Sequence, residues 1–366
     1  MQNFLSCLII PIINLTYYVM QYYIYLLIIV LLFTCCERES SDEVKSFPNT
    51  LELNSVPLTN IDTYFKPNVT LNVIDTFLVI ANQQAPFVRV YSTNSHKELY
   101  TFGKEGRGPG EFEYAEITKQ DYFHFEEGRG KKAAIVYDFK RNHFSALDIQ
   151  ASIEKQDDIA ISMMIPSDRN HISMLHYIGL EKVISTPLSS ANLLYYDIDD
   201  SAYNYVPFLP EVDINIKESN KNHIYRPAVF YNKTKSKTAV APMMLGRLDF
   251  FNDEGRYLNS SVFEMDQSGE SELEGELSDL RNAKYYVVDL DTLKNNIVAL
   301  NINTITDKIS SENQNNNLLL YDWDGNPKIK YKLDGIALKS FAVDHKHSRI
   351  YAYAPSQDYP IIMYQL

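Results

Sequence analysis

Residues 318–325 read LLLYDWDG, a short apolar strand that ends in an aromatic residue and runs into the Asp- and Gly-containing sequence of a tight turn. The same pattern occurs six times, at Tyr91 (VRVYSTN), Tyr137 (AIVYDFKRN), Tyr196 (LLYYDIDD), Phe251 (LDFFNDEG), Tyr321 (LLLYDWDG) and Tyr364 (IIMYQL). Successive aromatics are 46, 59, 55, 70 and 43 residues apart, near the roughly 40–50 residues of a four-stranded propeller blade. The repeats therefore predict an all-β, six-bladed β-propeller with four-stranded antiparallel blades, because a ring of blades buries faces that one blade leaves exposed.

The composition fits a β-rich domain and argues against one class of partner. The chain has 366 residues, of which 45% are hydrophobic, with 27 Tyr, 18 Phe and one Trp, Trp323. Aromatic residues are enriched in strands. The formal net charge of −13 argues against nucleic acid as a partner, because a nucleic-acid-binding face needs Lys and Arg to neutralise phosphates.

The N-terminal segment predicts an export signal that ends at a lipid-modified cysteine. Residues 1–36 contain no Asp, Glu, Lys or Arg, and they hold all three cysteines of the chain. The apolar run Tyr22–Thr34 has the length of a signal-peptide hydrophobic region and is too short to span a membrane comfortably. Residues 32–35 (LFTC) resemble a bacterial lipobox. Cys35 is therefore the predicted lipidation site, with Cys36 as the alternative.

This interpretation divides the chain into a signal peptide (1–34), a lipidated cysteine with a polar tether (35–46) and the propeller (47–366). It predicts a lipoprotein of the bacterial cell envelope, held at the outer membrane by its lipid. The acidic residues after the cysteine resemble the tether of surface-exposed lipoproteins.

Two alternatives stay open for this segment. One is a transmembrane anchor over Phe4–Thr34, and the other is a plain signal peptide cut beyond the cysteines. A translation start at Met20 would explain the lack of basic residues before the apolar run.

Two further segments fall outside the repeat. Asn49–Lys66 precedes the first blade and is expected to add a strand to the last one, which would close the ring. Glu264–Asp279 carries seven acidic residues and no Lys or Arg, and this insertion explains the 70-residue gap. A solvated loop is the simplest interpretation. A Ca²⁺ site, which does not match EF-hand spacing, and a docking strip for a basic partner are the alternatives.

The segment Gly103–Phe112 (GKEGRGPGEF) holds four of the thirteen glycines. It lacks the Lys-Ser/Thr ending of a P-loop. Glycines suit a connection that leaves the outer strand of one blade and drops to the next, because they allow positive φ and close backbone crossing. Lys104 and Arg107 are the candidate ligand-binding residues, since they would contact an anionic ligand if this loop reaches the channel mouth.

No pattern in the chain predicts catalysis. His345 and His347 form an HxH pair, but the surrounding sequence predicts a hairpin turn for both. Asp289 and Asp291, together with Asp62, are candidate carboxylates, yet a spacing of two is that of one strand face. There is no GxSxG motif and no cysteine after Cys36. We therefore assign no catalytic residue, no metal ligand and no cofactor.

Three segments resemble a known family. GKEGRGPGEF, YDWDGNPKIKYKLD and SFAVDHKHSRIYAYAP are similar to the BF3164-like lipoproteins of Bacteroidetes, which have a TolB-like six-bladed propeller. The glycine segment also resembles the inter-blade connection of NHL-type propellers. The resemblance covers roughly residues 45–366 and the leader, and it implies a lipid-anchored propeller without assigned catalytic residues.

Two functional classes follow from these observations. The preferred one is a binding or interaction module that presents its loops to a protein, peptide or glycan. The alternative is a propeller lyase or hydrolase, with or without Ca²⁺. An enzyme of this kind is expected to bring His, Asp and Glu from three or more blades to one mouth of the channel.

Overall fold

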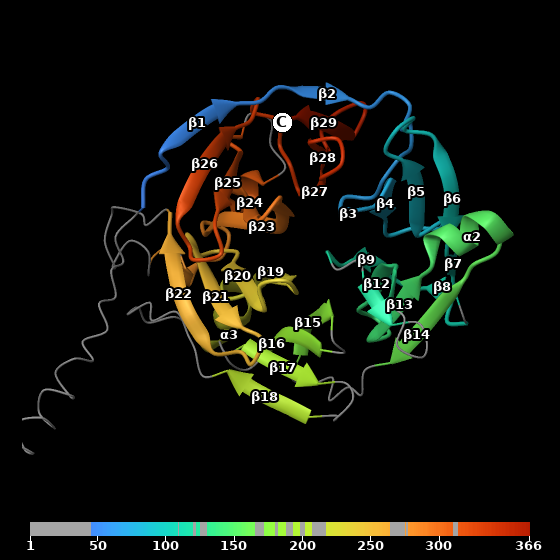
Figure 1. Cartoon of the computed structure of the whole chain (residues 1–366). Coiled ribbons are helices and arrows are strands. Elements are labelled where there is room, and N and C mark those ends of the chain that lie inside the picture. Colours follow the sequence, from blue (N-terminus) through green and yellow to red (C-terminus); the bar gives the residue numbers. More distant parts are fainter. Residues whose placement is uncertain are drawn as a thin grey trace, which may run out of the picture. The chain divides into compact units, whose positions relative to one another are not determined.

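Short apolar strands pair with their chain neighbours into antiparallel sheets that surround a central axis (Figure 1). The computed structural model describes residues 45–108, 110–119, 122–124, 130–164, 172–179, 182–187, 193–197, 202–206, 217–263, 275, 277–309 and 314–366. They belong to one unit, residues 44–366. The predicted signal peptide, Cys35, Cys36 and most of the tether lie outside the described residues. No described helix is both long and apolar enough to cross a membrane.

The chain has an all-β propeller fold, and each sheet is named here by its innermost strand. Four sheets are formed from consecutive parts of the chain: β3 (Thr70–Ile74), β4 (Phe77–Ala81), β5 (Val88–Ser92) and β6 (Glu98–Phe102); β9 (Glu116–Ile117), β12 (Ala134–Asp138), β13 (His143–Leu147) and β14 (Ala160–Met164); β15 (Ile172–Gly179), β16 (Lys182–Pro187), β17 (Leu193–Asp197) and β18 (Ala202–Val206); β19 (Pro227–Asn232), β20 (Lys237–Pro242), β21 (Arg247–Asn252) and β22 (Tyr257–Val262).

The other two large sheets each include a strand from the N-terminal segment: β27 (Ser340–Asp344), β28 (Arg349–Tyr353) and β29 (Ile361–Gln365) with β2 (Ser55–Pro57); β23 (Lys284–Leu293), β24 (Asn296–Ile305), β25 (Asn317–Tyr321) and β26 (Pro327–Lys332) with β1 (Asn49–Glu52). The predicted four-stranded antiparallel blade is thus confirmed for five sheets. The β23 sheet differs because β1 adds a fifth strand, parallel to β26.

Smaller elements decorate the connections between these strands. They are the pairs β7 (Lys104–Glu105) with β8 (Glu111–Phe112) and β10 (Tyr122–His124) with β11 (Gly130–Lys132), the helices α2 (Ile149–Lys155) and α3 (Glu218–Ile224), and the 3-10 turn Thr306–Lys308. Asp148 caps α2, because its side chain accepts a hydrogen bond from the Ala151 amide at 3.0 Å.

Five of the six repeat aromatics occupy the third strand of their sheet, namely Tyr91, Tyr196, Phe251, Tyr321 and Tyr364. Tyr137 differs, because it lies near the end of β12, the second strand of its sheet, although the predicted strand and the turn after it are present there too. Its ring stacks on Phe144 in the third strand β13, at 4.6 Å between centroids. In this sheet Phe144 therefore takes the third-strand position that the repeat aromatic holds in the other five.

The repeat turns also hold neighbouring sheets together. Trp323, in the turn between β25 and β26, is 3% exposed and packs against Phe230 and Phe250 of the β19 sheet, at 6.4 and 6.2 Å. Lys237 donates to the Trp323 carbonyl at 2.9 Å. The single tryptophan therefore reports on packing between two sheets.

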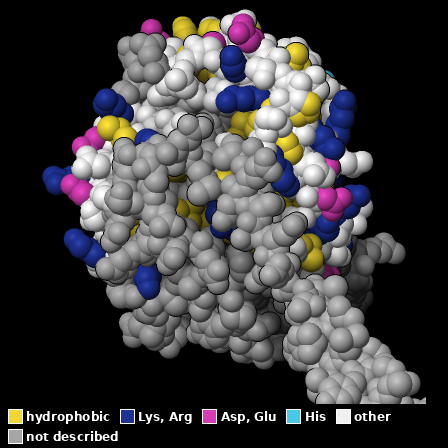
Figure 2. Space-filling model, turned by 90° about the vertical axis from the view of Figure 1, so that its left-hand side faces the viewer, with side chains coloured by type: hydrophobic (Ala, Val, Ile, Leu, Met, Phe, Trp, Pro, Cys, Tyr) yellow, Lys and Arg dark blue, Asp and Glu magenta, His cyan; other side chains and the backbone are white. Residues whose placement is uncertain are grey.

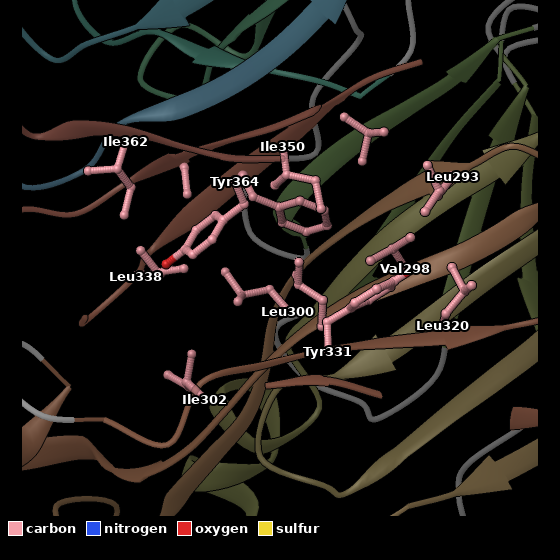
Figure 3. Close-up of a cluster of buried hydrophobic side chains, with 14 of the residues drawn as sticks. Leu293, Val298, Leu300, Ile302, Leu320, Tyr331, Leu338, Ile350, Ile362 and Tyr364 are labelled. Carbon is pink, nitrogen blue, oxygen red and sulfur yellow. The ribbon is translucent and has the colours of Figure 1, made fainter. Parts of the chain in front are cut away.

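A second cluster fills the space between the β23 and β27 sheets (Figure 3). Val298, Leu300 and Leu320 of one sheet face Ile362 and Tyr364 of the other, and all are buried. Burying such side chains stabilises the fold by about 1.5–3 kcal/mol each. The apolar alternation of the repeats thus becomes an inter-sheet core.

Two strands from the N-terminal segment close the ring. The antiparallel pair β2–β29 confirms the predicted extra strand in the last sheet. Asp334 fixes this closure, because it accepts from the amide and hydroxyl of Ser55 at 2.8 and 2.6 Å and from the Tyr364 hydroxyl at 2.9 Å. The alternation in residues 50–53 also predicts a strand, and β1 is found there, but it pairs in parallel with β26 of the β23 sheet instead of joining the last sheet.

The surface that carries β1, β22 and β26 shows mixed charge (Figure 2). Lys and Arg side chains are scattered over its described part, interleaved with Asp and Glu. Such mixing is typical of an ordinary solvated surface.

The acidic insertion lies between β22 and β23, and most of Glu264–Asp279 falls outside the described residues. The long interval between Phe251 and Tyr321 has a second cause. Strands β23 and β24 have ten residues each, against five or six in most other strands.

The glycine segment is confirmed as a connection, because it joins the outer strand β6 to the inner strand β9 of the next sheet. It is held by Arg141, which donates to the carbonyl oxygens of Glu111 at 2.6 Å and Arg107 at 3.0 Å. Gly103 has φ +84°, and a Cβ atom there would lie 2.7 Å from the buried Phe112 ring. Only glycine fits at this position.

We expect Gly103→Ala to destabilise the protein by at least about 1 kcal/mol more than Gly110→Ala. Both glycines have positive φ, +84° and +72°, so an alanine incurs a backbone penalty of roughly 1–2 kcal/mol at either site. Only Gly103 adds a steric conflict, since the nearest atom to a Cβ at Gly110 is 3.8 Å away. Urea denaturation followed by Trp323 fluorescence measures the difference. Equal losses of unfolding free energy in the two variants would show that the Phe112 ring moves aside without an energetic penalty.

Candidate functional site

A cavity of about 370 Å³ lies at the end of the ring where the innermost strands begin. We call it the channel pocket. Its lining includes the first residue of four inner strands, Thr70, Glu116, Pro227 and Ser340, and also Asp289 of β23. Five sheets thus contribute described residues to one site. This volume is within the range of small-ligand pockets, roughly 300–1,000 Å³.

Lys119, just after β9, forms the floor of the channel pocket. Its ammonium donates to the carbonyl oxygens of Leu71 in β3 and Phe341 in β27, and lies 3.1 Å from Asp289 Oδ2 and 3.9 Å from Asp291 Oδ2 in β23. The Lys119 side chain is 10% exposed. The Lys119 ammonium therefore connects four sheets. Its partners Leu71 and Phe341 each follow by one residue the first residue of their strand, Thr70 or Ser340, which lines the pocket.

The carboxylates of Asp289 and Asp291 both bind Lys119 and backbone amides of β27. Asp289 Oδ2 also accepts from the Phe341 amide, and Asp291 Oδ2 accepts from the Val343 amide, both at 3.0 Å. Burial raises the pKa of Asp289, and the Lys119 ammonium acts in the opposite direction. The two aspartates thus join β23 to β27, and the positive charge of Lys119 is already balanced.

Three other charged side chains line the pocket, and among the described residues they lack the ion pairs and hydrogen bonds that hold Lys119, Asp289 and Asp291. Glu116, Arg226 and Lys339 make no ion pair and no side-chain hydrogen bond within the described part of the chain. Burial raises the pKa of Glu116, an effect that nearby Arg226 opposes and Asp289 reinforces. Burial also lowers the pKa of Lys339. The Thr118 hydroxyl is buried in the same lining and has no hydrogen-bond partner among the described residues.

An aromatic pair extends the pocket wall towards solvent. Tyr114 lines the pocket, and burial, reinforced by Glu116, raises its pKa to about 12. The Phe139 ring packs edge-on against Tyr114 at 4.5 Å between centroids and is 47% exposed. The wall is therefore apolar at the rim and charged inside.

The predicted ligand residues of the glycine segment lie elsewhere. Neither Lys104 nor Arg107 lines the channel pocket. Arg107 is 79% exposed and pairs with Glu113 at 2.9 Å, and Lys104 is exposed. A ligand-binding role for these two residues stays a prediction.

The histidine pair has the predicted location, because His345 and His347 both lie in the turn between β27 and β28. The His347 ring pairs with buried Asp344 at 2.7 Å. Among the described residues, no three His, Cys, Asp or Glu side chains are close enough to share a metal ion.

Sequence reasoning missed Glu116, Arg226 and Lys339. They belong to no motif and are separated by more than a hundred residues along the chain. What they share is position, because each lies at or directly before the start of an innermost strand. A search for charged residues at the first strand of every repeat would have found them.

Comparisons with known proteins show the fold only. No family model matches the chain. No curated protein matches it either. Among solved structures, it is similar to a member of the DUF4221 family from Bacteroides vulgatus, with a TM-score of 0.53 and 11% identity over 86% of this chain and 95% of that one.

Two other structures show weaker likeness. Virginiamycin B lyase from Staphylococcus aureus, a catalytically inactive variant crystallised with quinupristin, has a TM-score of 0.45 and 10% identity over 83% of this chain and 82% of that one. A chain of a mitotic checkpoint complex has a TM-score of 0.44 and 11% identity over 88% of this chain and 93% of that one. These two likenesses carry no argument about the site, which is interpreted from its own residues.

Proposed function

We propose that this protein is a binding module whose ligand occupies the channel pocket and carries an anionic group. The observation that carries the proposal is the pair of pocket cations, Arg226 and Lys339, which have no ion-pair partner among the described residues. Lys119 is different, since Asp289 and Asp291 balance its charge. Lys339 is half-buried and Arg226 is exposed at the pocket, and a ligand anion would supply a counter-charge to both.

The rest of the chain supports this choice of ligand. The net charge of the chain is −13, so two cations in one pocket differ in sign from the protein's overall charge. The Arg226 guanidinium can bind a carboxylate or phosphate through two parallel hydrogen bonds.

The alternative, a propeller lyase or hydrolase, has less support. The described carboxylates of the pocket lining come from two sheets, through Glu116 and Asp289, and the described lining contains no histidine. Asp289 is held by Lys119 and the Phe341 amide, which leaves Glu116 as the one carboxyl without a partner there. A raised pKa on one carboxyl is compatible with acid–base chemistry but does not require it.

We expect Arg226→Gln to weaken anion binding by at least tenfold. A hydrogen bond to a charged group contributes about 1.5–3 kcal/mol, which corresponds to roughly 10–150-fold in affinity. Isothermal titration of the purified protein with citrate, succinate, glutamate, galacturonate and AMP measures the loss, and Lys339→Gln tests the second cation.

Arg281→Gln is the matched control, because Arg281 is 78% exposed, pairs with Asp279 at 2.9 Å and does not line the pocket. It should leave affinity unchanged. The proposal is wrong if none of these anions binds the wild-type protein, or if binding survives both pocket substitutions.

We also infer that the ring has six blades and belongs with the BF3164-like propellers. Five four-stranded sheets count as five blades, and β23–β26 form a further antiparallel set of four. The added strand β1 then lies outside the blade pattern as part of the ring closure.

We further propose that lipid on Cys35 holds the protein at the bacterial outer membrane. The support is the short apolar run Tyr22–Thr34 before the cysteine and the polar residues after it. Cys35→Ser should abolish metabolic labelling with an alkyne palmitate analogue, whereas Cys36→Ser should leave it intact. The reverse pattern would move the modification to Cys36, and labelling in both variants and the double variant would refute the anchor.

A further inference from the structure

Exposed aromatic side chains gather at the end of the ring where the channel pocket opens. Within the described part of the chain, the exposed large aromatics are Tyr64, Phe139 and Tyr359, at 76%, 47% and 36% exposure. Their positions follow from the strand directions. Exposed aromatic surface at the rim of a pocket is typical of an interaction site.

The topology places all three residues at this end. Tyr64 lies three residues before Pro67, which lines the pocket. Phe139 lies in the connection from β12 to β13, and Tyr359 in the connection from β28 to β29. Strands β9 and β27 begin at the pocket, and β12 and β28 run antiparallel to them. The connections that follow β12 and β28 therefore return to the pocket end.

The pocket interior offers a different chemistry from its rim. The lining holds the exposed cation Arg226, the half-buried Lys339 and Glu116, and the Thr118 hydroxyl, which has no hydrogen-bond partner among the described residues. At the rim, Phe139 packs against Tyr114 of the pocket wall. A matching ligand has an anionic group, hydroxyls that bond to Glu116 and Thr118, and a flat apolar face that stacks on aromatic rings.

On the basis of the function proposed above, we infer that the channel pocket binds the acidic end of an oligosaccharide. A terminal uronic acid has the required carboxylate and hydroxyls, and its neighbouring sugars present C–H faces to Tyr114 and Phe139. A nucleotide would also combine an anionic group with a stacking face, so AMP is the competing probe in the test. Lys119 bridges four sheets at the inner side of the pocket, and this bridge favours a chain end over the middle of a chain as the bound part.

Titration calorimetry of the purified full-length protein tests the inference with defined probes. These are the trimers of galacturonic, glucuronic and mannuronic acid, their methyl esters, galacturonate monomer, citrate and AMP. At least one acidic trimer should bind more tightly than citrate, AMP and the monomer. Its ester should bind at least tenfold more weakly, because the carboxylate charge is lost.

Phe139→Ser separates sugar stacking from anion binding. It should weaken the acidic trimer at least fivefold and leave the monomer and citrate unaffected. Leu99→Ser is the control, because Leu99 is a 39%-exposed apolar residue of the outer strand β6. It should change nothing.

The outcomes distinguish this inference from the function on which it rests. If no trimer exceeds its ester, if AMP or citrate binds best, or if Phe139→Ser has no effect, the oligosaccharide assignment is wrong. Citrate binding that still depends on Arg226 would then leave the anion-binding function standing. If no probe depends on Arg226, both proposals fail.

Discussion

Lys119→Met is expected to lower the free energy of unfolding by about 3–5 kcal/mol, the cost typical of removing one partner from a buried ion pair. Methionine keeps the apolar stem but not the ammonium. Asp289 would lose its ion-pair partner 3.1 Å away, and the carbonyl oxygens of Leu71 and Phe341 would lose their shared donor. Because four sheets meet at this ammonium, the loss should appear in global unfolding. Urea denaturation followed by Trp323 fluorescence measures it.

Lys132→Met is the matched control. Lys132 forms an ion pair with Asp75 at 2.5 Å, but the two side chains are 49% and 56% exposed, so the loss should stay below about 1 kcal/mol. Similar small losses in both variants would mean that the four sheets do not depend on Lys119.

The deficit of Lys119→Met should also shrink as the pH falls from about 7 to about 4. Burial raises the pKa of Asp289, and the Lys119 ammonium opposes that rise. In the variant the folded-state pKa of Asp289 therefore rises further above its unfolded value. Ionised Asp289 then destabilises the native state above the unfolded pKa, and protonation at lower pH removes the penalty. A deficit that grows on acidification would contradict this account.

Val56→Pro should destabilise the protein by roughly 3 kcal/mol, although the Val56 side chain is 55% exposed. The Ser55 amide donates to Asp334, and the Leu58 amide donates to the Ile361 carbonyl at 3.0 Å. Amides alternate along a strand, so the amide of Val56 points towards β29. Proline removes this donor from the strand that closes the ring.

Val56→Ala is the control, since it keeps the amide and should cost less than about 1 kcal/mol. Thermal unfolding of the two variants against the wild type tests the comparison. Equal melting temperatures for the proline and alanine variants would show that β2 contributes little to closure.

The repeat predicts the fold well because each of its parts depends only on neighbouring residues in the sequence. An apolar strand, an aromatic and a polar turn are needed in every blade, and Tyr321 with its turn at Trp323 is found where the pattern places it. The strand and turn predicted at Tyr137 are present as well, but spacing alone does not say that this aromatic lies in the second strand and that Phe144 lies in the third.

The pocket could not be predicted in this way. Glu116, Arg226 and Lys339 meet only when distant strands share an axis, and a linear pattern does not contain that proximity. Lys104 and Arg107 were predicted as ligand-binding residues because glycines and cations lie close together in that part of the sequence. In the structure this segment connects one sheet to the next. Arg107 is exposed there and forms an ion pair with Glu113.

The strand β2 has a consequence for how the protein forms during synthesis. Its partner β29 lies about 300 residues later in the chain, so β2 leaves the ribosome long before its partner exists. At translation rates of about 5–20 residues per second, the wait is roughly 15–60 s. In that interval β2 must stay unpaired, and the β27 sheet is the last to be completed. A nascent chain therefore cannot form its closed ring early, and the free edge of β29 is exposed to intermolecular pairing until β2 docks.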